Sequence, residues 1–471
     1  MRIITKLRTG AFAGFIYEAR WALLFTFIVY GANITTSDIR GDSIMYTMVA
    51  KNIVTMKEYF ILHYDGADYM NKPPIFFWIN SLMMALFGFT TFSAKIGSVL
   101  IAAALSLSIY QLAKKLTGSA NIANLTVFVM NTSYIVYRHN YSVRLEGVVT
   151  LFMVLAVLSY VYYTDENRQR YMYLFGFFSG LAFMSKGFVG IIHLGGVGIF
   201  MLLYGREVFS KRNLPHLILA FMLFLATFGW WYAYVSLHTD FFNHFFNNQV
   251  LDRMMNGLFH EEGKSAKYLE RPVYQYVIYL SKYYFMYIPF LVYGCWKALK
   301  SMTPVYRKGI LLVFIIMTFE LFLIHFVSTR DKRYLYQFFV FASVFTAVGV
   351  SSLIRISYEK MLAGVSVIYA LFLIIYPGQT NWDTYGFLET LKSMSSSSGM
   401  PVVARVQDFK NHENRAGVMY FLDEYITDEP LSGEYFMIIE NEMSDPALRV
   451  IRETRRIKIG IKSASAEMPT Q

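Results

Sequence analysis

Residues 35–74 read TTSDIRGDSIMYTMVAKNIVTMKEYFILHYDGADYMNKPP and form the first long polar stretch after the first hydrophobic segment. Asp42 and Tyr46 are one helical turn apart, so a helix here would place both on one face. Lys72 precedes two prolines, which favour an extended backbone around it. We therefore predict that a carboxylate and a cation face one site, although an ordinary solvated loop could carry the same residues.

The composition of the whole chain places this stretch in a membrane protein. The 471 residues are 55% hydrophobic, 18% aromatic and 16% charged, which leaves too few polar residues to cover a soluble surface. The net charge of +11 lies mostly in short loops between apolar segments, so nucleic-acid binding is disfavoured. The single cysteine, Cys295, excludes a disulfide within the chain. The predicted fold class is a polytopic α-helical membrane protein.

Apolar segments of about 20 residues mark the membrane spans. We predict about eleven, at residues 19–36, 95–115, 119–137, 147–164, 171–186, 188–204, 215–236, 273–296, 309–327, 334–353 and 360–376. Another apolar run, PPIFFWINSLMMALFGF at 73–89, is nearly long enough, but a crossing there would put several later basic clusters outside. It is therefore interpreted as a juxtamembrane helix within a first outer loop, residues 37–94, with the N-terminus of the chain cytoplasmic.

The composition becomes polar after residue 376. An odd number of spans places residues 377–471 outside the membrane, and their apolar patterns predict a small soluble α/β domain. The predicted strands are PVVARV, EYFMIIE and RRIKIGI, and the predicted helices are NRAGVMYFLDEY and SDPALRVIRE. The chain is thus divided into a membrane domain, residues 1–376, and an extracytoplasmic domain.

Charged residues gather at the predicted outer ends of the spans. They are Arg138, Arg144, Glu146, Lys186, Arg253, Arg330, Lys332 and Arg333. A single basic residue at a span end commonly reaches toward lipid headgroups, but the positive-inside rule disfavours basic residues on this side. Their accumulation near Asp42 and Glu146 therefore predicts a buried site for an anionic ligand.

Two carboxylates in one site suit a divalent ion as well as proton transfer or ion pairing. Histidines on the predicted outer side could join them, and these are His63, His139, His238, His244 and His260. The sequence has no metal-ligand spacing such as HExxH, so no cofactor is predicted, and a divalent metal stays an open alternative. It also lacks a GxSxG elbow and a phosphate-cradling glycine loop, which disfavours a serine hydrolase and a nucleotide-driven motor.

Several motifs follow one another along nearly the whole chain: GDSIMYTMVAKNI, NKPPIFFWI, YSVRLEGVVTLF, FMSKGFVG, FNNQVLDRMMNG, STRDKRYLYQ and GVMYFLDEY. In this order they resemble the GT-C membrane glycosyltransferases of the protein O-mannosyltransferase type, a group that includes the bacterial lipid A aminoarabinose transferase. The resemblance implies a sugar donor carried on a polyprenyl phosphate and a lipid, glycan or protein acceptor. It also implies an integral protein of the bacterial inner membrane whose active site and C-terminal domain are periplasmic.

By position, the resemblance implies catalytic roles for Asp42 and for Glu146, which matches the second acidic residue of the site. The contacts to the donor phosphate that the resemblance implies are Lys72, Tyr46 and Arg253, and Lys186 matches a lysine of the family at the end of a span. We expect Arg333 to contact the phosphate as well, and the cluster of outer charges adds Arg144 and Lys332 as further site candidates. The chain departs from the pattern of the family at Ser43, Met45 and Asn71, so the resemblance does not specify the sugar or the acceptor.

The mechanism that we expect is a single displacement. An acceptor hydroxyl attacks the anomeric carbon opposite the lipid phosphate and inverts it, while Asp42 accepts or orients the hydroxyl proton. The cations stabilise the departing phosphate. A transporter or flippase for an anionic polyprenyl lipid is the alternative, although alternating access calls for a site near the middle of the membrane.

Overall fold

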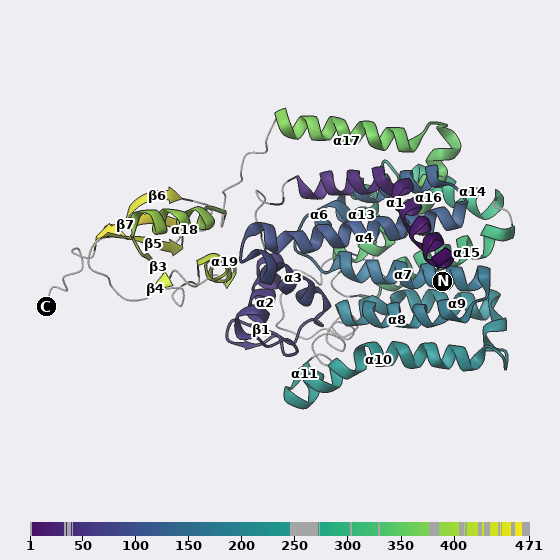
Figure 1. Cartoon of the computed structure of the whole chain (residues 1–471), viewed down its shortest axis with the longest axis horizontal. Coiled ribbons are helices and arrows are strands. Elements are labelled where there is room, and N and C mark those ends of the chain that lie inside the picture. The colour runs from purple at the N-terminus through teal and green to yellow at the C-terminus, as the bar shows by residue number, and fades with distance from the viewer. Residues whose placement is uncertain are drawn as a thin grey trace.

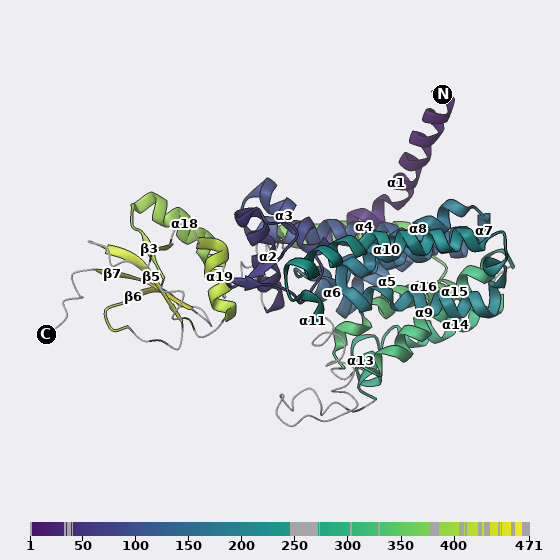
Figure 2. The same cartoon turned by 90° about the horizontal axis from the view of Figure 1, so that it is seen from below.

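The structure is a computed structural model, which describes residues 2–32, 34, 39, 41–244, 272, 274–301, 304–327, 330–375, 386–404, 409, 412–422, 426–427, 434–440, 443, 445–453 and 457–463. Most of the chain forms a bundle of long helices, and the C-terminal part forms a small sheet with two helices (Figure 1). Between them, at one end of the bundle, lie α2 (Asp42–Met56), α3 (Ile75–Phe87) and the short strands β1 (His63–Tyr64) and β2 (Ala67–Asp68) (Figures 1 and 2).

The helices of the bundle are apolar over most of their length. In chain order they are α1 (Arg2–Gly31), α4 (Thr91–Thr117), α5 (Ala120–Thr132), α6 (Tyr134–Asn140), α7 (Glu146–Glu166), α8 (Gln169–Lys186), η1 (Gly187–Ile191), α9 (Ile192–Tyr204), η2 (Arg206–Phe209), α10 (Leu214–His238), α11 (Phe241–His244), α13 (Gln275–Tyr283), α14 (Ile288–Ser301), α15 (Pro304–Ile324), η5 (Lys332–Leu335), α16 (Tyr336–Leu353) and α17 (Tyr358–Ile375).

Six helical segments among the described residues are long and apolar enough to cross a membrane, so the protein is an integral membrane protein. They are Ala13–Gly31, Thr91–Thr117, Glu146–Glu166, Gln169–Tyr204, Leu214–His238 and Lys332–Leu353. The segment Gln169–Tyr204 contains two of the predicted spans, joined through η1. The other predicted spans fall on α5, α13 with α14, α15 and α17, so the count of about eleven stays a prediction.

The apolar run at 73–89 forms α3, whose 13 residues are too short to cross the hydrocarbon. The helix begins after Pro74 and ends at Gly88, whose φ of 72° favours glycine. It packs against α2 and α4, which fixes α2 at the end of the bundle.

Some helices of the bundle approach one another closely because glycine replaces a side chain at the contact. A Cβ added to Gly176 of α8 would lie 2.1 Å from the carbonyl oxygen of Ala220 in α10. Small residues allow such contacts between membrane helices, where packing rather than hydrophobicity drives association. The close contact therefore fixes α8, whose last residue is Lys186, against α10.

The C-terminal sheet has the strand order β4-β3-β5-β7-β6. Its elements are α18 (Gly386–Ser398), β3 (Val402–Val403), α19 (His412–Leu422), β4 (Ile426–Thr427), β5 (Glu434–Glu440), β6 (Arg449–Glu453) and β7 (Ile457–Ser463). Strand β3 pairs in parallel with β4 and β5, whereas β7 pairs antiparallel with β5 and β6.

The predicted helix SDPALRVIRE is wrong. Asp445 begins a turn in which the Leu448 N–H donates to its carbonyl oxygen, and Arg449–Glu453 continue as the edge strand β6. All five residues of β6 are exposed, so the sequence lacks the alternation of buried and exposed residues that would indicate a strand. The hydrogen bonds to β7 outweigh the helix propensity of Arg and Glu.

Helix α19 joins the C-terminal sheet to α2. The Lys51 Nζ of α2 donates to the carbonyl oxygen of Met419 at 2.7 Å, near the C-terminal end of α19. The Tyr420 hydroxyl donates to the Thr90 carbonyl oxygen at 2.9 Å. A cation near the last carbonyls of a helix interacts favourably with its dipole, so Lys51 stabilises this junction.

Candidate active site

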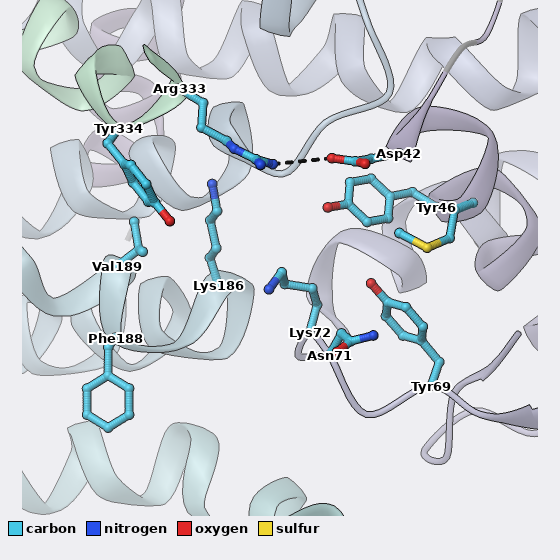
Figure 3. A pocket seen from close by; sticks show the side chains of 11 residues that line it. Asp42, Tyr46, Tyr69, Asn71, Lys72, Lys186, Phe188, Val189, Arg333 and Tyr334 are labelled. Atoms are coloured by element: carbon cyan, nitrogen blue, oxygen red, sulfur yellow. Dashed lines mark hydrogen bonds and ion pairs between the residues drawn. The ribbon is translucent and has the colours of Figure 1, made fainter. Parts of the chain in front are cut away.

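A cavity of about 320 Å³ lies at the end of the bundle where α2 begins. Its wall combines four separate parts of the chain: α2, the loop before α3, the junction of α8 with η1, and η5 (Figure 3). The lining residues are Asp42, Met45, Tyr46, Tyr69, Asn71, Lys72, Lys186, Phe188, Val189, Arg333 and Tyr334. Several polar side chains end around this one space, which is typical of a ligand site.

Asp42 is the first residue of α2 and follows Gly41, whose φ of 57° and ψ of −136° suit glycine alone. Two arginines donate to the Asp42 Oδ2 atom, Arg144 Nη1 at 2.6 Å and Arg333 Nη1 at 3.2 Å. The Asp42 side chain nevertheless keeps 41% of its surface exposed. The carboxylate is therefore held by two charge-assisted hydrogen bonds and is still open to a ligand.

Tyr46 lies one turn further along α2 and is almost fully buried. The rings of Phe76 and Phe77 meet it edge to face at centroid distances of 6.2 and 5.8 Å. Burial raises the pKa of the Tyr46 phenol well above its usual value, and the charges of Asp42 and Glu146 raise it further. The hydroxyl therefore stays protonated and can donate a hydrogen bond into the cavity.

Glu146 and Lys186 form a buried ion pair beside the cavity. Glu146 is the first residue of α7 and Lys186 the last residue of α8, so the antiparallel helix pair brings them together. Lys186 Nζ donates to Glu146 Oε1 at 2.6 Å, and the side chains are 10% and 3% exposed. Lys186 lines the cavity, whereas Glu146 lies behind it and is not among the lining residues.

Lys72 and Asn71 enter the cavity from the loop that the two prolines end. The Lys72 side chain points into the space that Lys186 reaches from the opposite wall (Figure 3). The Asn71 Oδ1 atom accepts a hydrogen bond from the His244 Nε2 atom at 3.4 Å. Among the described residues, three cations, Lys72, Lys186 and Arg333, and one carboxylate, Asp42, line the cavity. This excess of positive charge suits an anion.

The remaining predicted site residues differ in their placement. Arg144 reaches the site through Asp42 but is not among the lining residues. Lys332 is not among the lining residues, and its Nζ lies 5.4 Å from the ring centroid of Tyr283. Arg253 lies outside the described residues.

Sequence reasoning missed four of the lining residues: Tyr69, Phe188, Val189 and Tyr334. Tyr334 is adjacent to Arg333 and precedes a buried helix, which is the one signal that could have indicated it. Phe188 and Val189 follow Gly187, whose φ of 65° ends α8 and redirects the chain into η1. The sequence indicates this break, because the predicted spans 171–186 and 188–204 are divided at Gly187, but the direction that the chain takes after it is decided by packing.

The described residues contain no group of three or more His, Cys, Asp or Glu side chains that could hold a metal ion. Among the histidines that could have joined a metal site, His139 is buried, and its Nδ1 lies 2.7 Å from the carbonyl oxygen of Ile135. His260 lies outside the described residues.

The chain is similar to several known proteins in sequence and in fold. Residues 71–231 match the family model of the dolichyl-phosphate-mannose-protein mannosyltransferases. The undecaprenyl phosphate-alpha-4-amino-4-deoxy-L-arabinose arabinosyl transferase 1 of Proteus mirabilis is 25% identical over 404 residues, which are 81% of this chain and 69% of that enzyme. An uncharacterized protein of Aquifex aeolicus is 28% identical over 44% of this chain, and the chain spans only 42% of the length of that relative.

Among solved structures, ArnT from Cupriavidus metallidurans bound to undecaprenyl phosphate superposes with a TM-score of 0.66. The superposition covers 98% of this chain and 100% of ArnT at 14% sequence identity, so it shows a shared fold. The family match, which contains Lys72 and Glu146, agrees with it. Together these findings confirm the resemblance that the sequence motifs predicted: the chain has the fold of the GT-C membrane glycosyltransferases and is similar in sequence to their bacterial aminoarabinose transferases.

Proposed function

We propose that the protein is a membrane glycosyltransferase that moves a sugar from a polyprenyl phosphate to a lipid, glycan or protein acceptor. The observation that carries the proposal is the cavity at one end of the bundle, where the half-exposed Asp42 carboxylate faces Lys72, Lys186 and Arg333. A general base and a cluster of cations are the two functions that displacement of a lipid phosphate from a sugar requires. The similarity to the arabinosyl transferases supports this reading.

The charge of the donor changes in the direction that the cavity favours. A sugar linked to a lipid phosphate is a phosphodiester with one negative charge, and its departure leaves a phosphate monoester with a charge of about −1.5 to −2. Lys72, Lys186 and Arg333 would therefore interact more strongly with the leaving phosphate than with the bound donor. Interactions that strengthen in the transition state accelerate the reaction.

The chemical step that we propose is an inverting displacement. The acceptor oxygen forms a bond to the anomeric carbon while the bond from that carbon to the phosphate oxygen breaks. The proton of the acceptor hydroxyl passes to Asp42, which also orients the hydroxyl, and the electron pair of the broken bond stays on the lipid phosphate. The protonated Tyr46 hydroxyl donates to a phosphate or sugar oxygen.

The position of the site agrees with a reaction at a membrane surface. We propose about eleven spans in the bacterial inner membrane, with a cytoplasmic N-terminus and the cavity on the periplasmic side. Residues 1–376 would form the catalytic membrane domain and residues 377–471 a periplasmic domain, which contacts α2 through α19. Met45 and Asn71, where the chain departs from the family, line the cavity and are candidates for selecting the sugar.

Mass spectrometry of lipid A, surface glycans and membrane proteins tests the proposal in cells with and without the gene. Deletion is expected to remove one sugar mass from one acceptor. A Lys72→Ala variant should reduce that product by about 10²- to 10³-fold, because it removes one cation from the phosphate site. Lys211→Ala, which alters an exposed lysine beyond η2, is the matched control and should leave the product unchanged.

The same experiment separates the transferase from a flippase. If every acceptor keeps its mass in the deletion strain while a polyprenyl-linked precursor accumulates on one side of the membrane, movement of the lipid rather than transfer of its sugar is the function.

A further inference from the structure

A second cavity, of about 250 Å³, lies at the opposite end of α7 from Glu146. Tyr160 and Tyr163 of α7 line it, together with Tyr204 at the end of α9 and Glu207 of η2. Tyr160 is 14 residues beyond Glu146, which corresponds to about 21 Å along the helix. The cavity is therefore separate from the candidate active site.

Aromatic rings form one wall of this second cavity. The ring centroid of Tyr160 lies 5.8 Å from that of Tyr163 and 6.3 Å from that of Phe200. The ring centroids of Phe200 and Tyr204 are 5.8 Å apart. The faces of such rings are electron-rich and attract cations, and ammonium groups are commonly held in this way. The wall thus provides a surface for a cationic group.

Within the described part of the chain, the Tyr160 hydroxyl is an unpartnered polar group at the wall of the cavity. Tyr160 is fully buried, and its hydroxyl has no hydrogen-bond partner among the described residues. Gly205, another lining residue, lies beside it, since a Cβ at that position would be 3.5 Å from the hydroxyl oxygen. A buried hydroxyl without a partner is costly, so a ligand that bonds to it would gain affinity.

The entrance of the cavity carries one charge of each sign. Lys308 Nζ and Glu207 Oε1 are 3.5 Å apart, and their side chains are 57% and 70% exposed. Leu203 and Phe209 are exposed apolar residues that flank the lining residues Tyr204 to Val208 in the sequence. Because a membrane-spanning segment ends at Tyr204, the entrance lies where the hydrocarbon of the bilayer meets the headgroups.

We propose that this cavity binds the headgroup of a phospholipid that carries both a phosphate and a primary ammonium, the phosphatidylethanolamine class. The ammonium lies among the aromatic rings and donates to the Tyr160 hydroxyl and to Glu207. The phosphate contacts Lys308 at the entrance, and the acyl chains remain in the bilayer. A quaternary ammonium has no N–H to donate to Tyr160, and an uncharged glycerol headgroup has no attraction to the rings or to Glu207.

Native mass spectrometry of the full-length protein, released from nanodiscs, tests this site. Discs contain phosphatidylethanolamine, phosphatidylcholine or phosphatidylglycerol with identical acyl chains, and retention of one lipid per protein is measured. We expect phosphatidylethanolamine to be retained in preference to the other two. Soluble phosphoethanolamine at millimolar concentration should not displace it, because the acyl chains anchor the lipid; displacement would indicate a site for a free metabolite and overturn the proposal.

Tyr160→Phe should weaken retention of phosphatidylethanolamine by roughly tenfold, since it removes one hydrogen bond to a charged group. Tyr110→Phe is the matched control: the Tyr110 hydroxyl is also buried without a partner among the described residues, yet it does not line the cavity. Equal retention of all three lipids, or the same retention in both variants, would overturn the proposal. A second measurement tests the proposal even if Tyr160→Phe lowers the stability of the protein. Excess phosphatidylethanolamine should raise the unfolding temperature of the Tyr110→Phe protein but not that of the Tyr160→Phe protein.

Discussion

The two carboxylates of the candidate active site, Asp42 and Glu146, have opposite environments. Asp42 begins the short helix α2 at the end of the bundle, has two arginine partners and is 41% exposed. Glu146 begins the membrane helix α7, has one lysine partner and is 3% exposed. Both carboxylates pair with cations, but Asp42 is open to the cavity, whereas Glu146 is covered.

From this difference we infer different tasks for the two residues. An accessible carboxylate can take a proton from a substrate, which suits Asp42 to the reaction itself. A covered carboxylate can act only through its partner, and Glu146 holds the ammonium of Lys186 at the wall of the cavity. Two carboxylates whose surroundings differ commonly divide the chemistry of a site in this way.

Substitution of Asp42 is expected to have the largest effect on activity. Asp42→Asn removes the proposed proton acceptor, so the rate of sugar transfer should fall by about 10²- to 10⁴-fold. The free energy of unfolding should change by less than about 1 kcal/mol, because the ion pairs of Asp42 are partly exposed. Transfer assays in proteoliposomes and thermal unfolding measure the two quantities.

Asp65→Asn is the control for this variant. Asp65 has an ion-pair partner, Arg415, at 3.3 Å, and its φ of 54° is one that Asn also adopts. Its substitution should leave the transfer rate unchanged. Transfer by Asp42→Asn at the same rate as by Asp65→Asn would remove Asp42 from the chemistry.

Substitution of Glu146 should instead act first on stability. Glu146→Gln leaves the Lys186 ammonium buried without a carboxylate, which typically destabilises a protein by about 3 to 5 kcal/mol. The double substitution Glu146→Gln with Lys186→Met should recover most of that stability but not activity, because Lys186 lines the cavity.

Glu18→Gln is the control for Glu146→Gln, because it breaks an exposed ion pair instead of a buried one. Its partner is Lys114, and the two side chains are 45% and 34% exposed, so the change in unfolding free energy should stay below about 1 kcal/mol. Equal destabilisation by Glu146→Gln and Glu18→Gln would show that burial does not distinguish the two pairs, and the comparison would fail.

Substitution of Tyr46 should have the smallest effect of the three. Tyr46→Phe removes one hydrogen-bond donor from the cavity, and the transfer rate should fall by roughly tenfold. Because burial and the nearby carboxylates raise the pKa of Tyr46, its hydroxyl keeps its proton as the pH rises from about 7 to about 10. The pH profiles of wild type and Tyr46→Phe should therefore be parallel in this range. A wild-type rate that falls with pH while the variant rate does not would show that Tyr46 ionises there.

Local features of the site could be predicted from the sequence because they depend on residues close together in the chain. Helix α2 begins at Asp42, and Tyr46 follows one turn later, as the spacing predicted. Lys72 lies at the end of the loop before α3, where it is followed by Pro73 and Pro74. By contrast, the exposed edge strand β6 was mistaken for a helix, because its pairing with β7 leaves no pattern within its own five residues.

The sequence by itself determined the membrane character of the chain and the identity of its polar site-forming stretch, since hydrophobicity and helical period act within about 20 residues. Only the tertiary structure decided which cation meets which carboxylate. Arg144 and Arg333 reach Asp42 across 102 and 291 residues of sequence, and the adjacent Lys332 turns instead to Tyr283. Neighbours in the sequence separate in this way because the packing of η5 against the bundle, rather than residue type, sets the direction of each side chain.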